Sequence, residues 1–563
     1  MKQKLCALTA LILALSLLCG CANADLSWFT DRFKTRSQSA QSDDTQPDAD
    51  KSDDEEPATT AIVTELPTEV KSFGLSYQED YGLHPYNCES LNNRAIFSFI
   101  YEPLFAVTSD YRAEPILVDH WETDNDGFKT IIHLKSGILF HDGTPLTAQD
   151  AVWSILSARG SAYYGKRLYH VTAVEAADET TFVIVTNCAY ECLPLLLDMP
   201  VTKMPPPEPE ESEEADAEEA APAEAASEEP PPYVPPVGTG PYYLDGTERL
   251  VRWARWWQHE KPLVDFDEIT LCHTTTTANI RDNFEYSNIN LVLTDPNSAA
   301  YAGFHNDNEL WECATPVMQY IGYNLTSSVF SNYGLRGAIT YAIDRKTIVA
   351  DELDGFATEA VLPCLPQSPY YDTRLALDYD YDLEKCKSRL ADADIRDMDE
   401  DGILDVYVPS LGYAVPASGT MIVCSSGLSR VQTATDLVNT LNDLGFDITL
   451  QTLDYGDYQY ALSHGVYDLY FGEVRLSPNF DLTPFFSPSG ALNYGAMTDA
   501  TMLNLCDLML VNSGNSYNLY QRICERGYLT PVLFKSYGIY TTRGSVPAPN
   551  GYWDWFLPKK TEE

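Results

Sequence analysis

The chain has 563 residues, of which 44% are hydrophobic, and a formal net charge of −47 at pH 7. Single cores stop growing at about 250–300 residues, so a chain of this length is expected to fold as two or three domains. The acidic excess argues against nucleic acid as a partner, because contacts to phosphate groups need a basic face.

The N-terminus has the pattern of a bacterial export signal. Two lysines precede an apolar run from Leu5 to Leu18, which is too short to cross a membrane comfortably. The run ends in Leu-Cys-Gly-Cys, which resembles the bacterial lipobox, in which the cysteine after the cleavage site is lipidated. We predict a signal peptide at 1–20 and a lipid on Cys21 that anchors the extracytoplasmic protein to the cell membrane. The alternative is an ordinary secretory signal cut nearby, for example after Ala24.

Two segments are rich in proline, serine and acidic residues and almost lack large apolar side chains. One covers residues 21–60, and the other covers 203–236, where the stretch 205–232 holds eleven acidic residues and no basic one. Such a composition cannot bury enough surface to offset the entropy of ordering. We expect a disordered acidic linker after the anchor and a disordered acidic insert within the fold.

Folded structure is expected from about residue 61. A strand and a Gly/Pro turn are predicted in 70–87, a helix from about Asn92 to Phe105, and two extended runs in 126–140. Ten cysteines remain after Cys21, without a CxxC pair. Most are expected to be buried small hydrophobic residues, and one or two disulfides stay open.

The stretch FHDGTPLTAQDAVWSIL, residues 140–156, places His141 beside an aspartate, as an acid/base pair would require. Asp-Gly and the following proline are typical of a tight turn. Thr147 and Asp150 have the spacing of a capping box. A buried helix face is then predicted from the i, i+3, i+4 spacing of Ala151, Val152, Ile155 and Leu156. Since no nucleophile or metal-ligand partner stands at recognisable spacing, we interpret His141 as structural rather than catalytic.

The same stretch belongs to a series of motifs that resembles the bacterial extracellular solute-binding proteins of the oligopeptide, dipeptide and nickel class, family 5. The motifs occur in that family's order, and no one of them is specific by itself. They are YEPLF, DNDGF, LKSGILFHDGTPLTAQDAV, VGTGPYYL, LRGAITYAIDRKTIV, YDLEKCKSRL and DLGFDITL with GVYDLYFGE. The resemblance covers about residues 65–560, interrupted by the acidic insert.

This resemblance implies an α/β fold of the periplasmic-binding-protein-like type, with two lobes, a hinge and a ligand site between the lobes. The first lobe would cover 61–310, including an extra subdomain at about 90–195 and the acidic insert. The second lobe would cover 311–525, and 526–563 would return to the first lobe.

The resemblance also implies a function. The chain would be the substrate-binding lipoprotein of an ABC importer, a monomer that binds a small solute, predicted to be a peptide, and delivers it to permease and ATPase subunits. The alternatives are a non-peptide solute, such as a sugar, a cation or a metal chelate, or a ligand-sensing lipoprotein without a transport role. Neither an enzyme nor a cofactor is predicted, because no catalytic constellation was recognised in the sequence.

Peptide-binding members carry g-W-x-a-D on a strand near the cleft, and this aspartate pairs with the α-ammonium group of the peptide. Aligning the strand places Ser477 at the aspartate, which weakens the peptide assignment. Glu473 and Arg475 could supply replacement charge, or they could be exposed strand residues paired with each other. Glu89 is a weaker candidate partner for an amine. An aromatic lining is expected from tyrosines, with three candidates, Tyr77, Tyr86 and Tyr320.

Two further patterns contain residue types that can bind a ligand or a metal. DMDEDGILD has the D-x-D-x-D-G beginning of a calcium loop, but Val408 occupies the position of the closing carboxylate. A solvated acidic turn is favoured over a calcium site, whose ligands would be Asp397, Asp399, Asp401 and Asp405. In VRWARWWQHEKP, residues 251–262, arginines stand beside tryptophans, and packing within the first lobe is favoured over a ligand site.

Overall fold

The computed structural model describes most of the chain between residue 72 and residue 546. The described ranges are 72–206, 236–258, 264–295, 304 and 307–546. The predicted signal peptide, the lipid on Cys21, the acidic linker and nearly all of the acidic insert lie outside the described residues. These expectations stay predictions.

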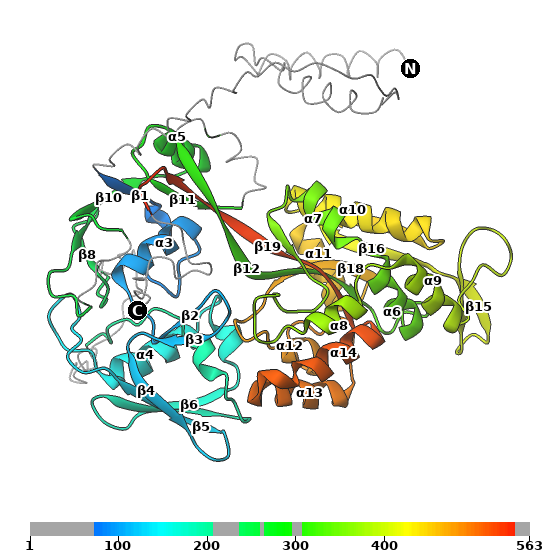
Figure 1. Ribbon diagram of the computed structural model, residues 1–563, viewed down its shortest axis with the longest axis horizontal. Helices are drawn as coiled ribbons and strands as arrows, with labels where there is room; N and C mark the ends of the chain where they lie inside the picture. The colour runs from blue at the N-terminus through cyan, green and yellow to red at the C-terminus, as the bar shows by residue number, and fades with distance from the viewer. Residues whose placement is uncertain (1–71, 207–235, 259–263, 296–303, 305–306, 547–563) are drawn as a thin grey trace, which may run out of the picture. The chain divides into compact units, whose positions relative to one another are not determined.

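Two lobes lie side by side, and one mixed sheet of eleven strands runs through both of them (Figure 1). In the first lobe, the central strand β1 is buried at every position and pairs in parallel with strands on both sides. From the middle of the sheet outward, the strands are β11 (Leu291–Thr294), β1 (Phe73–Tyr77), β10 (Glu268–His273), β9 (Arg249–Arg252) and β8 (Tyr242–Asp245). Two helices accompany them, α3 (Leu91–Ile100) and α5 (Thr277–Glu285), and η1 (Glu79–Tyr81) follows β1.

Helix α3 begins at Ser90, whose hydroxyl accepts a hydrogen bond from the backbone N–H of Asn93. The helix was predicted to reach Phe105 but ends at Ile100. Tyr101 is extended, and Glu102 precedes a proline, which disfavours helical geometry at that residue.

The first lobe carries a subdomain built on a four-stranded antiparallel sheet, in the order β4-β5-β7-β6. The strands are β4 (Val118–Thr123), β5 (Lys129–Leu134), β7 (Thr181–Thr186) and β6 (Val171–Ala176). Further elements are the hairpin β2 (Phe105–Val107) and β3 (Ala113–Pro115), α4 (Ala148–Arg159), η2 (Gly165–Leu168) and η3 (Leu193–Leu196). Of the two extended runs predicted in 126–140, the first is β5, and the second forms only an isolated bridge between Leu139 and Pro145.

Helix α4 begins as its sequence predicts. The backbone N–H and the hydroxyl of Thr147 both donate to the carboxylate of Asp150, at 2.9 Å and 2.6 Å. Ala151, Val152 and Ile155 are buried, but Leu156 is exposed, which corrects the prediction. Viewed down the helix axis, the buried residues form one face, with Asp150 at one edge of that face and Val152 at the other. Leu156 lies just outside the edge marked by Val152.

The second lobe contains the other half of the large sheet and most of the helices. Its strands are β16 (Ser418–Cys424), β17 (Asp447–Leu453) and β18 (Leu469–Arg475), with β13 (Ala357–Glu359) and a separate hairpin, β14 (Asp405–Val408) and β15 (Tyr413–Pro416). Its first helices are α6 (Tyr333–Ala342), α7 (Arg345–Glu352), α8 (Thr373–Asp378), α9 (Leu383–Asp392) and α10 (Leu428–Asp443). The later ones are α11 (Tyr455–His464), α12 (Thr483–Phe486), α13 (Ala500–Val511), η4 (Ser513–Asn515) and α14 (Ser516–Arg526).

Two long antiparallel strands, β12 (Asn308–Tyr323) and β19 (Leu529–Thr542), run from one lobe to the other (Figure 1). β19 pairs with β11 of the first lobe, and the later half of β12 pairs with β18 of the second. Their register shifts between Ala314 and Val317, where Pro316 cannot donate a ladder hydrogen bond. The predicted two-lobed α/β fold is confirmed. The predicted lobe boundary at 311 falls inside β12.

The ten cysteines between Cys88 and Cys524 are all free thiols, and seven of them are buried. Their predicted role as small hydrophobic residues is confirmed for these seven. No disulfide joins two of the described residues.

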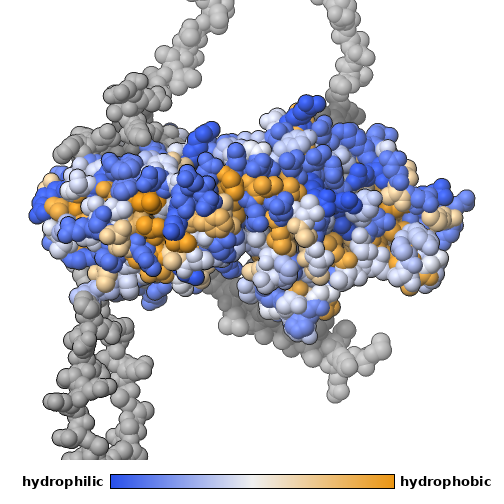
Figure 2. Space-filling model, turned by 90° about the horizontal axis from the view of Figure 1, so that it is seen from below, coloured by the Kyte–Doolittle hydropathy of each residue, from blue (hydrophilic) through white to orange (hydrophobic). Residues whose placement is uncertain are grey.

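The face in Figure 2 shows hydrophobic groups scattered among hydrophilic residues. Within the described ranges, every helix is too short or too polar to pass through a bilayer.

Candidate functional site

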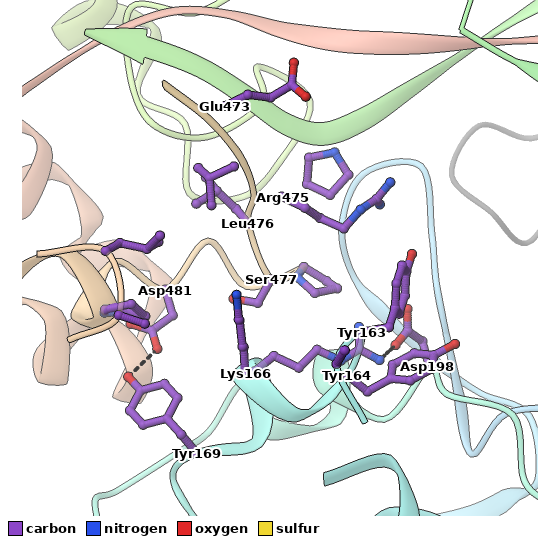
Figure 3. A pocket seen from close by; sticks show the side chains of 18 of the residues that line it. Tyr163, Tyr164, Lys166, Tyr169, Asp198, Glu473, Arg475, Leu476, Ser477 and Asp481 are labelled. Atoms are coloured by element: carbon purple, nitrogen blue, oxygen red, sulfur yellow. Dashed lines mark hydrogen bonds and ion pairs between the residues drawn. The ribbon is translucent and has the colours of Figure 1, made fainter. Parts of the chain in front are cut away.

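A cavity of about 890 Å³ opens between the two lobes (Figure 3). The first lobe lines it with one face of α3 and the segment 162–169 around η2. The second lobe lines it with the end of β18 and the loop 476–494, which includes α12. A volume of this size is within the range of about 300–1,000 Å³ that is usual for small-molecule sites.

The end of β18 brings Glu473 to the cavity, but this glutamate does not pair with its neighbour Arg475. Its carboxylate accepts hydrogen bonds from Arg430 at 2.9 Å and from the amide of Gln319 at 2.8 Å. The ammonium group of Lys535, on β19, lies 3.9 Å away. Glu473 is thus held by groups from α10, β12 and β19, and its charge is compensated within the protein.

Arg475 lies two residues further on the same strand and also lines the cavity. Its guanidinium carbon is 5.6 Å from the ring centroid of Tyr163, which belongs to the first lobe. The guanidinium carbon of Arg94, on α3, lies 3.6 Å from the same centroid. Tyr163 is therefore flanked by two arginines that the two lobes supply separately.

The wall formed by the first lobe has a second layer behind Tyr163. Arg94 donates to the hydroxyl of Tyr164 at 2.9 Å and to the carbonyl of Cys88 at 3.5 Å. Arg167 forms a close ion pair with Asp198, and both side chains are largely buried. These contacts hold the arginine side chains in place and compensate the one carboxylate on this wall.

Asp481 is a residue of the site that the sequence did not single out. It lies in the loop between β18 and α12, is buried, and lines the cavity. One oxygen accepts from the backbone N–H and the hydroxyl of Thr483, at 2.8 Å and 2.7 Å. The other accepts from the hydroxyl of Tyr169 at 2.7 Å (Figure 3), and His170 Nε2 lies 3.8 Å from it. The D-x-T pattern of an Asx turn was the only available signal.

The hydrogen bond from Tyr169 to Asp481 joins the two lobes. A second contact between the lobes lies near Asp481 in the sequence. The side-chain amide of Asn479 donates to the hydroxyl of Tyr190, at 2.8 Å, and this pair is buried. The hydroxyl of Ser477 donates to Asn479 Oδ1 at 2.7 Å. Ser477, one of the residues that the sequence predicted for the site, therefore supports a contact across the cleft.

The structure separates the sequence-predicted site residues into two groups. Glu473, Arg475 and Ser477 all line the cavity. The other four are not among its lining residues: Tyr77, Tyr86, Glu89 and Tyr320. Tyr86 is buried behind the wall and donates to the carbonyl of Pro200, whereas Tyr77 and Tyr320 are packed in two hydrophobic cores and Glu89 is exposed. A ligand contact by any of the seven stays a prediction.

His141 joins two of the family-like motifs to each other. Its Nε2 donates to the carbonyl of Gly240 at 2.9 Å, and its Nδ1 accepts from the N–H of Gly238 at 3.3 Å. This pairing requires the neutral ring, and burial lowers the pKa of His141 to about 4. The side chain secures the GTGP turn (residues 238–241) to the HDG turn, in agreement with the structural interpretation.

The GTGP turn also contacts a buried carboxylate, Glu102, whose side chain is fully inaccessible to solvent. Four donors reach it: the Thr239 hydroxyl, the indole N–H groups of Trp256 and Trp257, and the Gln258 amide, at 2.8–3.2 Å. Burial raises the pKa of Glu102 to about 7, although these hydrogen bonds act to lower it. The tryptophans near residue 255 thus pack within the first lobe, as predicted.

The acidic turn at 397–405 contains the four candidate calcium ligands. Asp397, Asp399 and Asp405 each place one carboxylate oxygen within 4.8 Å of the others. Asp397 accepts from the backbone N–H groups of Glu400 and Gly402. The carboxylates therefore have a structural explanation as turn formers, and calcium binding stays a prediction.

The chain was compared with known protein families and with curated proteins. The model "Bacterial extracellular solute-binding proteins, family 5 Middle" matches residues 112–493. The chain is similar to the glutathione-binding protein GsiB of Escherichia coli (strain K12), with 26% identity over 313 residues. This match covers 53% of the chain and 57% of GsiB, so the chain spans a little over half the length of the curated relatives it matches.

Solved structures share the fold at low sequence identity. The oligopeptide-binding protein AppA from Bacillus subtilis, in complex with a nonapeptide, has a TM-score of 0.55 and 19% identity, covering 87% of this chain and 98% of AppA. NikA from Brucella suis, in complex with Fe(III)-EDTA, has a TM-score of 0.62 and 19% identity, covering 87% of this chain and 100% of NikA. At such identity the likeness extends to the two-lobed fold alone.

Proposed function

Since the chain belongs to the bacterial extracellular solute-binding proteins of family 5, we propose that it is the substrate-binding component of an ABC importer. In this role it captures an oligopeptide-like solute between its lobes and delivers the solute to a membrane permease. The observation that carries this proposal is the cavity of about 890 Å³, which both lobes line.

Capture follows from the way the two lobes are connected. Strands β12 and β19 join the lobes, and their register is irregular at Thr315-Pro316 and again between Gln319 and Tyr320, where they can bend. Contacts such as Tyr169–Asp481 and Asn479–Tyr190 form only when the lobes approach. A solute that touches both lobes binds the closed form better and shifts the population toward it. The permease then distinguishes loaded from empty protein by shape.

Two features of the cavity favour a peptide-like solute. Its lining combines several tyrosines and prolines with a small number of charged groups, which suits a chain of amides with polar ends. The resemblance aligns Ser477 with the aspartate that peptide-binding members carry. Asp481 offers a carboxylate four residues later. We assign to Asp481 the pairing with an ammonium group that Ser477 cannot provide.

The loss of the aspartate at Ser477 is also the observation that favours the alternative, a non-peptide solute. An ion pair in a desolvated cleft is among the stronger contacts that a peptide can make. A sugar, a cation or a metal chelate does not require that contact. The transport role is the same in both cases.

The test is ligand-induced thermal stabilisation of purified residues 25–563. We expect a monomer whose Tm rises with a library of short peptides and not with sugars or metal chelates. Asp481→Asn should lose this response to peptides, whereas the control Asp447→Asn, at an exposed aspartate of β17, should keep it. A response to sugars or chelates alone would contradict the peptide assignment. Absence of any response within all three classes would contradict solute capture of this kind.

The location is a separate proposal. We assign the lipid anchor to Cys21, the acidic linker to 21–60, and the lobes to 61–310 and 311–525, with 526–563 returning to the first lobe. Cells fed a palmitate analogue should label the protein and retain it in the membrane fraction. Cys21→Ser should abolish the label and release the protein, and a label that survives would contradict the assignment.

A further inference from the structure

The charge of the cavity differs from the charge of the chain. The chain as a whole carries a formal charge of −47, yet the described residues that line the cavity include four basic side chains and three acidic ones. The basic ones are Arg94, Lys166, Arg167 and Arg475, and the acidic ones are Asp198, Glu473 and Asp481. A locally basic cleft in a strongly acidic protein needs an explanation within the cleft.

None of the three carboxylates is bonded to Arg94. Asp198 pairs with Arg167 within the cavity wall. Glu473 is bound by Arg430, which is not a lining residue. Asp481 accepts from hydroxyl and backbone groups. The acidic side chains of the lining are thus already bonded, and only one of them is matched with a basic residue of the lining.

Arg94 and Arg475 converge on one aromatic ring. Their guanidinium carbons lie 3.6 Å and 5.6 Å from the ring centroid of Tyr163. Arg94 is half-buried and has no carboxylate partner among the described residues; its hydrogen bonds go to the Tyr164 hydroxyl and to a backbone carbonyl. Two like charges held near each other in a partly desolvated cleft repel. An anion placed between them would turn that repulsion into attraction.

The ring beside the two arginines is accessible to a ligand. Tyr163 is 38% exposed although both arginines lie beside it. Lys166, three residues later, is exposed on the same wall and adds an ammonium group (Figure 3). Guanidinium groups bind carboxylates through two parallel hydrogen bonds, and a stacked guanidinium keeps its edge free for this purpose.

We infer that the cavity binds an anionic group of its solute, a carboxylate, between Arg94 of the first lobe and Arg475 of the second, beside the ring of Tyr163. This inference rests on the proposed capture of a solute by lobe closure and names the chemistry that the solute must carry. Because the two arginines come from different lobes, the same carboxylate that is recognised also favours the closed form. The carboxylate can be the end of a peptide or part of another organic acid.

The test compares each ligand with its neutral amide. Peptides that stabilise the protein are titrated calorimetrically as free acids and as C-terminal carboxamides, and succinate is compared with succinamide at constant ionic strength. The variants are Arg94→Gln and Arg475→Gln. The control is Arg526→Gln, which removes a guanidinium that lies 4.7 Å over the ring of Tyr333, outside the cavity.

For the wild type and the control, we expect the acid to bind about 10- to 100-fold more tightly than the amide, since hydrogen bonds to charged groups are worth about 1.5–3 kcal/mol. In Arg94→Gln and Arg475→Gln this ratio should fall to below about threefold. Circular dichroism and the Tm of the unliganded variants show whether they fold. If one variant does not fold, the other decides.

The outcomes separate this inference from the proposed function. If peptides bind and the acid and amide forms bind equally, or if both variants keep the ratio, the anion site is overturned and peptide capture stands. If no peptide binds, the peptide assignment fails, and succinate decides the anion site. Stabilisation by succinate but not by succinamide, lost in both variants, supports the site; equal effects of the two compounds overturn it.

Discussion

Glu102 allows the sharpest test of the first lobe, because it is a fully buried carboxylate with four hydrogen-bond donors around it. Burial raises the pKa of this group from 4.5 to about 7. The folded protein therefore keeps a proton at pH values where the unfolded chain has lost it. The stability that this group contributes is fully present below pH 4.5 and is lost as the pH rises to about 7.

The magnitude follows from the pKa. One pKa unit is worth about 1.36 kcal/mol, so a rise from 4.5 to about 7 amounts to roughly 3 kcal/mol across this range. Glu102→Gln removes the titration. Relative to the variant, the wild type should therefore be more stable at pH 4.5 than at pH 8. The difference between their free energies of unfolding should change by up to that amount over this range.

Urea unfolding followed by tryptophan fluorescence, at half-unit steps from pH 4.5 to 8, measures this difference. Glu89→Gln, at an exposed glutamate, is the control and should show no such slope. A constant difference between the wild type and Glu102→Gln would refute the reasoning. It would mean that the four donors hold Glu102 ionised throughout and outweigh its burial.

Three further substitutions test other contacts by the same unfolding measurement. His141→Ala should cost about 2 kcal/mol, because it leaves two polar backbone groups of the GTGP turn unpaired; an unchanged stability would contradict the structural role. For Asp499, burial raises the pKa, but hydrogen bonds from Tyr528 and Arg522 outweigh this and lower it to about 2. Its contribution, about 1 kcal/mol after solvent screening, is present above pH 3.8 and lost toward pH 2, so the cost of Asp499→Asn should vanish in acid. A cost that persists at pH 2 would count against the ion pair. Gly322→Ala should cost about 1–3 kcal/mol, since its Cβ would lie 2.1 Å from a tyrosine ring of β18; a variant as stable as the wild type would show that the ring can move.

Much of the local structure could be read from the sequence, because its causes are local. Thr147 and Asp150 predict the start of α4 through a capping box that involves only neighbouring residues. The predictions were wrong where the local structure or the burial of a residue depends on its tertiary surroundings. Leu156 fits the helical period, yet the subdomain does not cover it. The helix predicted to reach Phe105 stops at Ile100 before a proline.

The candidate site shows the same division. Glu473 and Arg475 were expected near the cleft from the resemblance to peptide-binding members of the family, and both line the cavity. Their partners could not be predicted. Glu473 binds Arg430 of α10 rather than its strand neighbour, because the helix that packs beside the strand brings a guanidinium group within reach. Asp481 has no pattern of its own beyond a short turn.

The sequence by itself determined the structural role of His141 through local turn chemistry and periodicity, and the order of its motifs carried the resemblance that implied the two-lobed α/β class. The tertiary structure alone decided which charges share the cavity. Arg94, Tyr163 and Arg475 come from α3, the η2 segment and β18, and they meet because β12 and β19 carry the chain from one lobe to the other. Proximity across a cleft depends on that long-range pairing, which no local pattern encodes.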